Sequence, residues 1–202
     1  MFDRDFLRRP SVDVAPLLLG AVLHGRGVSV RLTEVEAYLG EVDPGSHAFR
    51  GETPRNRVMF GEPGHLYTYF TYGMHVCANV VCSPVGTATA VLLRAGEVVD
   101  GLELARERRT TSCTDADLAR GPARLVVALG ITLTDNGLDL ESDDVTLELT
   151  GERPSAKHGP RTGVSGAGGT TAYPWRFWIP GDPTVSPYKV SAPKKRSRSA
   201  TL

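Results

Sequence analysis

Two carboxylates and a phenol alternate along one stretch of the chain, and this spacing suits a general base in a cleft. Glu34, Glu36 and Tyr38 occupy every second position, so in a strand their side chains point to one face. The apolar residues before them share that parity, which predicts a strand over Val28–Tyr38 that runs from the core into a polar cleft. Glu36, beside an aromatic ring, is the best candidate for the base, although spacing alone does not separate it from Glu34. A solvent-exposed carboxylate at a strand end is the simpler alternative.

Aromatic residues and arginines gather next along the chain. Five of the thirteen residues in Phe60–Tyr72 are aromatic, and an arginine-bearing stretch, Thr53–Arg57, lies just upstream. Tyrosines interleaved with arginines suit base stacking and phosphate contact, whereas a core strand beside a basic loop is the plainer alternative. Because Tyr72 stands next to Gly73 at an expected hairpin turn, it is poorly placed for burial and well placed to wedge between stacked bases.

The elements expected to position these residues mix helices and strands without βαβ alternation, so the predicted fold class is α+β. Residues 66–72 and 74–82 form a hairpin in this interpretation. The pattern also predicts helices over 13–23, 100–109 and 122–130, with Asp13 and Asp100 as caps, a long loop over 40–63, and strands over 88–95, 145–149 and 176–179. We expect one domain over residues 1–190 and a basic, flexible tail over 191–202.

Composition excludes several classes of protein. The 202 residues are 41% apolar and 23% charged, as in a globular protein, and the longest apolar stretch, Val14–Leu23, is too short to cross a bilayer. Acidic residues among the first arginines argue against a signal peptide, so we expect a cytoplasmic protein. The cysteines are Cys77, Cys82 and Cys113. Their odd number predicts reduced, buried thiols, and their spacing does not supply four zinc ligands.

The net charge is zero, but the charges are unevenly distributed. Residues 1–31 sum to +2, residues 32–100 to −4, residues 101–150 to −5 and residues 151–202 to +7. The zero total argues against a nucleic-acid partner, whereas the basic C-terminal quarter argues for a polyanion. A solvated tail is the plainer explanation of the basic run at residues 194–198.

Several motifs stand in a fixed order with fixed spacing across residues 13–100. They are Thr33–Gly40, Asp43 with His47, Thr53–Arg57, Met59–Phe60, Pro63–Gly64, Leu66–Tyr67, Tyr69, Tyr72–Met74, Asn79 and Leu92–Arg94. This order resembles the alkyladenine (3-methyladenine) DNA glycosylase family, and the resemblance continues more weakly at 121–125, 161–164 and 176–177. It implies a curved antiparallel β-sheet flanked by helices, with a protruding hairpin. It also implies hydrolysis of the bond between a damaged purine and its sugar after base flipping, which leaves an abasic site.

The resemblance also implies a role for each matching residue. Glu36 activates the attacking water, and Arg94 lies near that water and the phosphate of the lesion. Tyr38, His47 and Tyr69 enclose the everted base in an electron-rich slot, which favours a cationic, alkylated purine.

Other matches concern the rest of the nucleotide. Asn79 reads the minor-groove edge of the purine and excludes the 2-amino group of guanine, and Tyr72 fills the gap in the base stack. Arg55 and Arg57 are weaker matches, to contacts with the DNA backbone. Two apolar residues line the pocket wall or belong to the core, Met59 and Leu92.

All four lysines follow residue 150, so none lies between Glu36 and Arg94 to form a Schiff base. This favours a monofunctional glycosylase without cofactor or metal, and no acid for neutral lesions is identified. We expect a monomer whose partner is double-stranded DNA containing damaged purines, associated with the nucleoid if the source is bacterial. The alternatives are a non-catalytic nucleic-acid-binding module of similar fold, as in the C-terminal domain of methionyl-tRNA formyltransferase, and, less favoured, a nucleoside hydrolase.

Overall fold

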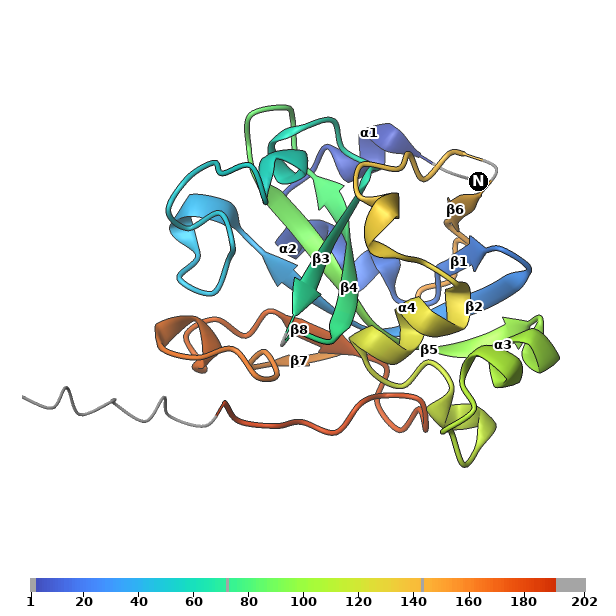
Figure 1. Ribbon diagram of the computed structural model, residues 1–202. Helices are drawn as coiled ribbons and strands as arrows, with labels where there is room; N and C mark the ends of the chain where they lie inside the picture. Colours follow the sequence, from blue (N-terminus) through green and yellow to red (C-terminus); the bar gives the residue numbers. More distant parts are fainter. Residues whose placement is uncertain (1–2, 72, 143, 192–202) are drawn as a thin grey trace, which may run out of the picture.

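Strands from most of the chain join in one curved antiparallel sheet in this computed structural model, which describes residues 3–71, 73–142 and 144–191 (Figure 1). The strand order is β3-β4-β5-β2-β1-β6, and β8 pairs with both β2 and β7. The strands are β1 (Val22–Gly25), β2 (Val28–Tyr38), β3 (Leu66–Thr71), β4 (His75–Cys82), β5 (Thr89–Asp100), β6 (Val145–Glu148), β7 (Lys157–Gly159) and β8 (Arg176–Trp178).

Short helices flank this sheet, so the fold is a single mixed α+β domain, and the predicted fold class is confirmed. The α-helices are α1 (Arg4–Leu7), α2 (Ser11–Val14), α3 (Leu102–Arg108) and α4 (Pro122–Leu129). The 3₁₀ turns are η1 (Ala15–Leu18), η2 (Gly40–Val42), η3 (Arg57–Phe60), η4 (Asp115–Asp117), η5 (Leu133–Asp135) and η6 (Ala167–Gly169). Helix α4 packs on β4 and β5, with proline in its first turn and Gly130 at its C-cap, as the sequence predicts.

The long strands β2 and β5 pair at the centre of the sheet, and two of the three register shifts between them compensate each other. Leu32 pairs with Gly96 and Glu34 pairs with Ala95, so Thr33 of β2 has no opposite residue in this ladder. Val35 then pairs with Leu93, which leaves Arg94 of β5 unpaired and restores the register. A bulge re-aims the side chain that it carries. These two therefore place Glu34 and Arg94 next to each other at the strand centre.

The prediction of a helix over 13–23 is wrong in its second half. Helical turns end at Leu18, Gly20 takes a φ of 86°, and the chain returns as strand β1, which pairs with β2 and β6. Asp13 lies inside α2, whose N-cap is Pro10, so its predicted role as a cap is also wrong. Leu23 is buried in this strand, which pairs with its neighbours on both sides, and local helical spacing does not reveal such pairing.

The predicted cap at Asp100 is wrong as well. Asp100 ends β5, and the N-cap of α3 is Gly101 with a φ of 71°. A side chain at position 101 would collide with the carbonyl oxygen of Gly27, so this close approach requires glycine. The long loop over 40–63 is present and contains the turns η2 and η3.

The main apolar core lies between the sheet and the helices, and a smaller cluster, which includes Met59 and Tyr67, lies beneath the 40–63 loop. Cys77 and Cys82 are buried as expected, whereas Cys113 is exposed, so the prediction of a buried thiol is wrong there. Within the described residues, no helix is both long enough and apolar enough to span a bilayer.

Candidate active site

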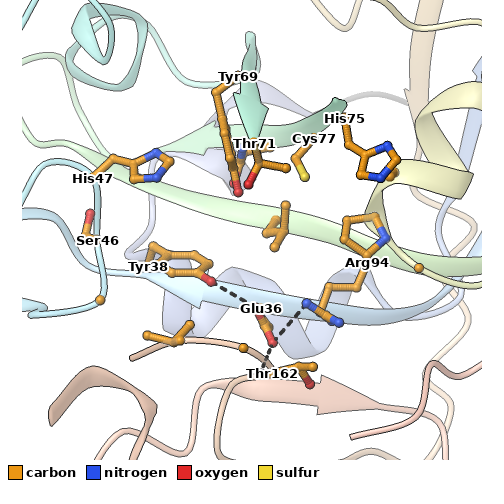
Figure 2. Close-up of a pocket in the computed structure, with 18 of the residues that line it drawn as sticks. Glu36, Tyr38, Ser46, His47, Tyr69, Thr71, His75, Cys77, Arg94 and Thr162 are labelled. Carbon is orange, nitrogen blue, oxygen red and sulfur yellow. Dashed lines mark hydrogen bonds and ion pairs between the residues drawn. The ribbon is translucent and has the colours of Figure 1, made fainter. Parts of the chain in front are cut away.

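A cavity of about 490 Å³ opens beside the centre of β2 and β5 (Figure 2). Its walls come from those strands, from the β3–β4 hairpin, from the loop at residues 44–47, from the start of α4 and from residues 162–165. Pockets for small ligands occupy about 300–1,000 Å³, so this volume suits a flat heterocycle with part of its sugar.

Glu36 lies at the floor of this cavity, and its side chain is fully buried. Its Oε2 atom accepts a hydrogen bond from the Tyr38 hydroxyl at 2.9 Å, and its Oε1 atom accepts one from the Thr162 backbone N–H at 2.6 Å. Arg94 Nη1 lies 3.3 Å from Oε1 (Figure 2). A carboxylate offers about four acceptor positions, so these three contacts fix the group and leave one acceptor position unused.

Arg94 is almost completely buried and also contacts the second carboxylate of β2. Its Nε donates to Glu34 Oε1 at 2.8 Å and its Nη2 donates to the Ser186 hydroxyl at 3.2 Å. Although burial lowers the pKa of Arg94, the charges of Glu36 and Glu34 raise it above its ordinary value. The guanidinium therefore stays charged and supplies a fixed positive charge at the cavity floor.

Aromatic rings face each other across the cavity, with Tyr38 on one side and His47 and Tyr69 on the other (Figure 2). The His47 and Tyr69 rings meet edge to face with centroids 4.5 Å apart, and Tyr67 lies 5.5 Å from Tyr69. His47 Nδ1 shares a hydrogen bond of 3.0 Å with the Tyr67 hydroxyl. The three residues predicted to enclose a base thus line one space.

The protonation of these rings follows from their surroundings. Burial raises the pKa of Tyr38 and of Tyr69 well above the ordinary value, and the nearby Glu36 carboxylate adds to both shifts. Burial, followed by the positive charge of Arg55, lowers the pKa of His47. At neutral pH the aromatic walls therefore carry no charge.

Asn79 and two apolar side chains complete the inner wall. The Asn79 amide donates to the Tyr67 carbonyl oxygen at 2.9 Å, which fixes the orientation of the amide. Met59 and Leu92 both line the cavity and are buried, so both alternatives for them, pocket wall and core, are correct. The Cys77 thiol also lies in this wall.

A buried ion pair fastens the loop that carries Thr162. Arg161 and Asp43 are both fully buried, and each guanidinium Nη atom donates to one carboxylate oxygen at 2.6 Å. The same guanidinium lies 4.4 Å from the centre of the Tyr38 ring. This contact joins the 40–45 loop, the 161–168 loop and the aromatic wall in one unit.

Comparison with known proteins agrees with this geometry. The sequence profile of methylpurine-DNA glycosylases matches residues 5–183, which is most of the chain. The chain belongs to the methylpurine-DNA glycosylase family. Members of this family are DNA glycosylases, enzymes that hydrolyse N-glycosyl bonds.

Relatives within the family resemble the chain over most of its length. A protein of Leifsonia xyli subsp. xyli is 60% identical over 195 residues, which cover 92% of each chain. One of Streptomyces avermitilis is 54% identical and covers 96% of this chain and 94% of its own. One of Nocardia farcinica is 54% identical, with coverages of 86% and 85%. All three carry the provisional name 3-methyladenine DNA glycosylase.

The remaining predicted residues of the candidate site lie farther out. Arg55 stands 5.7 Å from the centre of the Tyr69 ring and donates to the Phe70 carbonyl oxygen at 3.0 Å. Arg57 is exposed, pairs with Glu52 at 3.0 Å and does not line the cavity. The predicted wedge, Tyr72, lies outside the described residues, as does the tail from residue 192.

Several residues of this candidate site were not singled out as site residues from the sequence. Tyr67 shares the parity of Tyr69 and could have been found by it. Thr162 contacts Glu36 although the two residues are 126 positions apart in the sequence, and no local sequence pattern predicts that contact. Arg120, just before α4, and Arg124, in its first turn, also line the cavity. Among the described residues, no cluster of three histidines, cysteines or carboxylates could hold a metal ion.

Proposed function

We propose that the cavity binds an everted, alkylated purine of the 3-methyladenine type and that the protein hydrolyses its N-glycosidic bond in base-excision repair. A base inside a duplex hides this bond, so the nucleotide must leave the stack. The observation that carries the proposal is a buried carboxylate, Glu36, held at the floor of an aromatic-walled cavity beside one guanidinium.

In this proposal Glu36 and Arg94 act on the water and the sugar. The Glu36 carboxylate takes a proton from water as the oxygen approaches C1′, and its charge stabilises the cationic sugar that develops there. Arg94 orients the same carboxylate and faces the phosphate side of the nucleotide. The C1′–N bond breaks, its electron pair leaves with the purine, and the sugar keeps a hydroxyl as an abasic site.

The aromatic walls select the leaving base by charge. Tyr38, Tyr69 and neutral His47 present electron-rich surfaces, which attract a purine made cationic by alkylation. Such a base is already a good leaving group and needs little acid catalysis. The fixed Asn79 amide discriminates against the 2-amino group of guanine at the inner edge. Deaminated purines are neutral and form a slower substrate class.

The lining of the cavity supports hydrolysis without strand cleavage. None of the described residues that line it is a lysine, so no amine is placed to form a Schiff base with the sugar. We accordingly propose a monofunctional, monomeric, metal-independent enzyme of the cytoplasm. Its partner is duplex DNA, with Tyr72 as the wedge that fills the stack and Arg55 and Arg57 at the backbone.

A panel of single-lesion duplexes tests this function. Duplexes that carry 3-methyladenine, 7-methylguanine, hypoxanthine or ethenoadenine are incubated with the protein, and free base is separated by chromatography. We expect release of 3-methyladenine and an intact strand that breaks only after alkali treatment. Tight binding without release would favour a non-catalytic binding module, and release from free nucleosides alone would favour a nucleoside hydrolase.

A further inference from the structure

Glu34 lies beside the cavity and contributes nothing to its lining. Its fully buried carboxylate accepts hydrogen bonds from Arg94 Nε at 2.8 Å, Arg176 Nε at 2.6 Å and the Ser186 backbone N–H at 2.7 Å. Burial raises the pKa of Glu34, but the charges of the two arginines and the Ser186 N–H lower it overall. Glu34 is therefore an ionised group with three buried partners and no contact with the cavity.

Arg94 is consequently shared between two carboxylates. Two of its nitrogens are bound away from the cavity, Nε by Glu34 and Nη2 by the Ser186 hydroxyl at 3.2 Å. Only Nη1 faces Glu36, at 3.3 Å, which is longer than a strong charge-assisted hydrogen bond. The bulge in β5 at Arg94 gives the side chain this unusual direction.

This division has a consequence for Glu36. If Arg94 were released from Glu34, it could form a bidentate ion pair with the Glu36 carboxylate. This is the geometry that a guanidinium prefers with a carboxylate. Because Tyr38 and Thr162 already occupy two acceptor positions, such a pair would fill the positions that remain. The carboxylate would then have no free position to receive a proton from water.

The charge balance favours the same outcome. The negative charges of Glu34 and Glu36 balance the positive charges of Arg94 and Arg176, so this buried cluster of four side chains has no net charge. Loss of the charge at position 34 leaves two guanidiniums near one carboxylate, which strengthens the attraction of Arg94 to Glu36 in a medium of low dielectric constant. The 184–186 segment closes this group, since all the polar atoms of Ser186 contact it.

We propose that Glu34 is a positioning residue for base excision, which restrains Arg94 so that Glu36 keeps an acceptor position for the attacking water. The inference rests on the proposed function of the cavity. It assigns to the second carboxylate of β2 an action on the reaction through Arg94, without contact with the substrate.

A kinetic cycle tests this role. Single-turnover release of 3-methyladenine is measured for the wild type, Glu34→Gln, Arg94→Met and the double variant. Affinity is measured on a duplex whose lesion carries a 2′-fluoro group, which resists hydrolysis. We expect Glu34→Gln to slow release by about 10- to 100-fold while affinity stays within about twofold of the wild type. The double variant should be no slower than Arg94→Met, because effects that act through one group do not add.

Asp135→Asn is the matched control. Asp135 is also a buried carboxylate paired with an arginine, Arg26, at 2.7 Å, but it lies outside the cavity. This variant should lose thermal stability and keep the wild-type rate per folded molecule. If Glu34→Gln does not fold, Ser186→Ala decides, since it removes one partner of Arg94 and should slow release without loss of affinity.

The outcomes separate the inference from the function on which it rests. A wild-type protein that releases no base refutes the proposed function. If the wild type is active, three results would overturn the role of Glu34 and leave the proposed function intact. They are an unchanged rate in Glu34→Gln, an equal loss of rate and affinity in that variant, and additive losses in the double variant.

Discussion

In the proposed function, the imidazole of His47 contributes to the charge preference of the cavity. Its ring packs edge-on against Tyr69 and shares a hydrogen bond with Tyr67, and burial beside Arg55 lowers its pKa. Because the ring is neutral at physiological pH, a cationic purine meets no repulsion there. At a pH below its lowered pKa, His47 would be protonated, and its positive charge would face the positive charge of the purine.

This predicts a pH effect that depends on the charge of the lesion. The ratio of affinities for 3-methyladenine and undamaged duplexes should fall by roughly fivefold on acidification below the ordinary titration range of histidine, a cost near 1 kcal/mol. Fluorescence anisotropy in a Glu36→Gln background measures it without turnover. His47→Gln should abolish the fall, and a neutral ethenoadenine duplex should not show it. An equal fall with the neutral lesion would contradict this account of His47.

At the scale of elements, the sequence predicted what local patterns determine and missed what pairing determines. The strand β2 has the predicted ends, and α4 begins and ends at the predicted proline and glycine. The bulges at Thr33 and Arg94 arise from the pairing of two strands about sixty positions apart. Glu36, Tyr38 and Tyr69 could be recognised from spacing and resemblance, whereas the contact of Thr162 exists only in the folded chain.

The Arg161–Asp43 pair joins the two loops that frame the cavity. Asp43→Asn should destabilise the protein by about 3–5 kcal/mol, because it leaves the buried guanidinium of Arg161 without its counter-charge. Urea unfolding measures this change. Excision should also slow, since the loop of Thr162 loses its anchor.

Glu41→Gln is the control for that experiment, as this exposed carboxylate lies in the same loop. It should change stability by less than about 0.5 kcal/mol. Equal stability of the two variants would show that the buried pair does not hold the loops.

At the scale of the whole molecule, charge separates the chain into acidic and basic parts. Residues 32–150, which contribute most of the cavity, sum to −9, whereas residues 151–202 sum to +7. Arg120 and Arg124 nevertheless line the cavity, and Arg55 stands over the Tyr69 ring, so positive charge lies near the cavity although the net charge of the chain is zero. We infer that non-specific affinity for DNA depends strongly on the C-terminal quarter.

This inference predicts the salt dependence of DNA binding. Replacing the four basic residues at 194–198 by glutamine should flatten the slope of log affinity against log salt by about 0.9 for each lost phosphate contact. Anisotropy with undamaged duplex between low and moderate salt measures the slope. Identical slopes for the variant and the wild type would assign DNA affinity to the folded domain alone.

The central claim is that Glu36 activates water at the sugar of an everted purine, and one isosteric change tests it. Glu36→Gln keeps the size of the side chain and removes the charge that accepts the proton. Single-turnover release of 3-methyladenine should fall by at least about 100-fold, while binding of the lesion duplex stays near that of the wild type. Release at the wild-type rate in this variant would contradict the account.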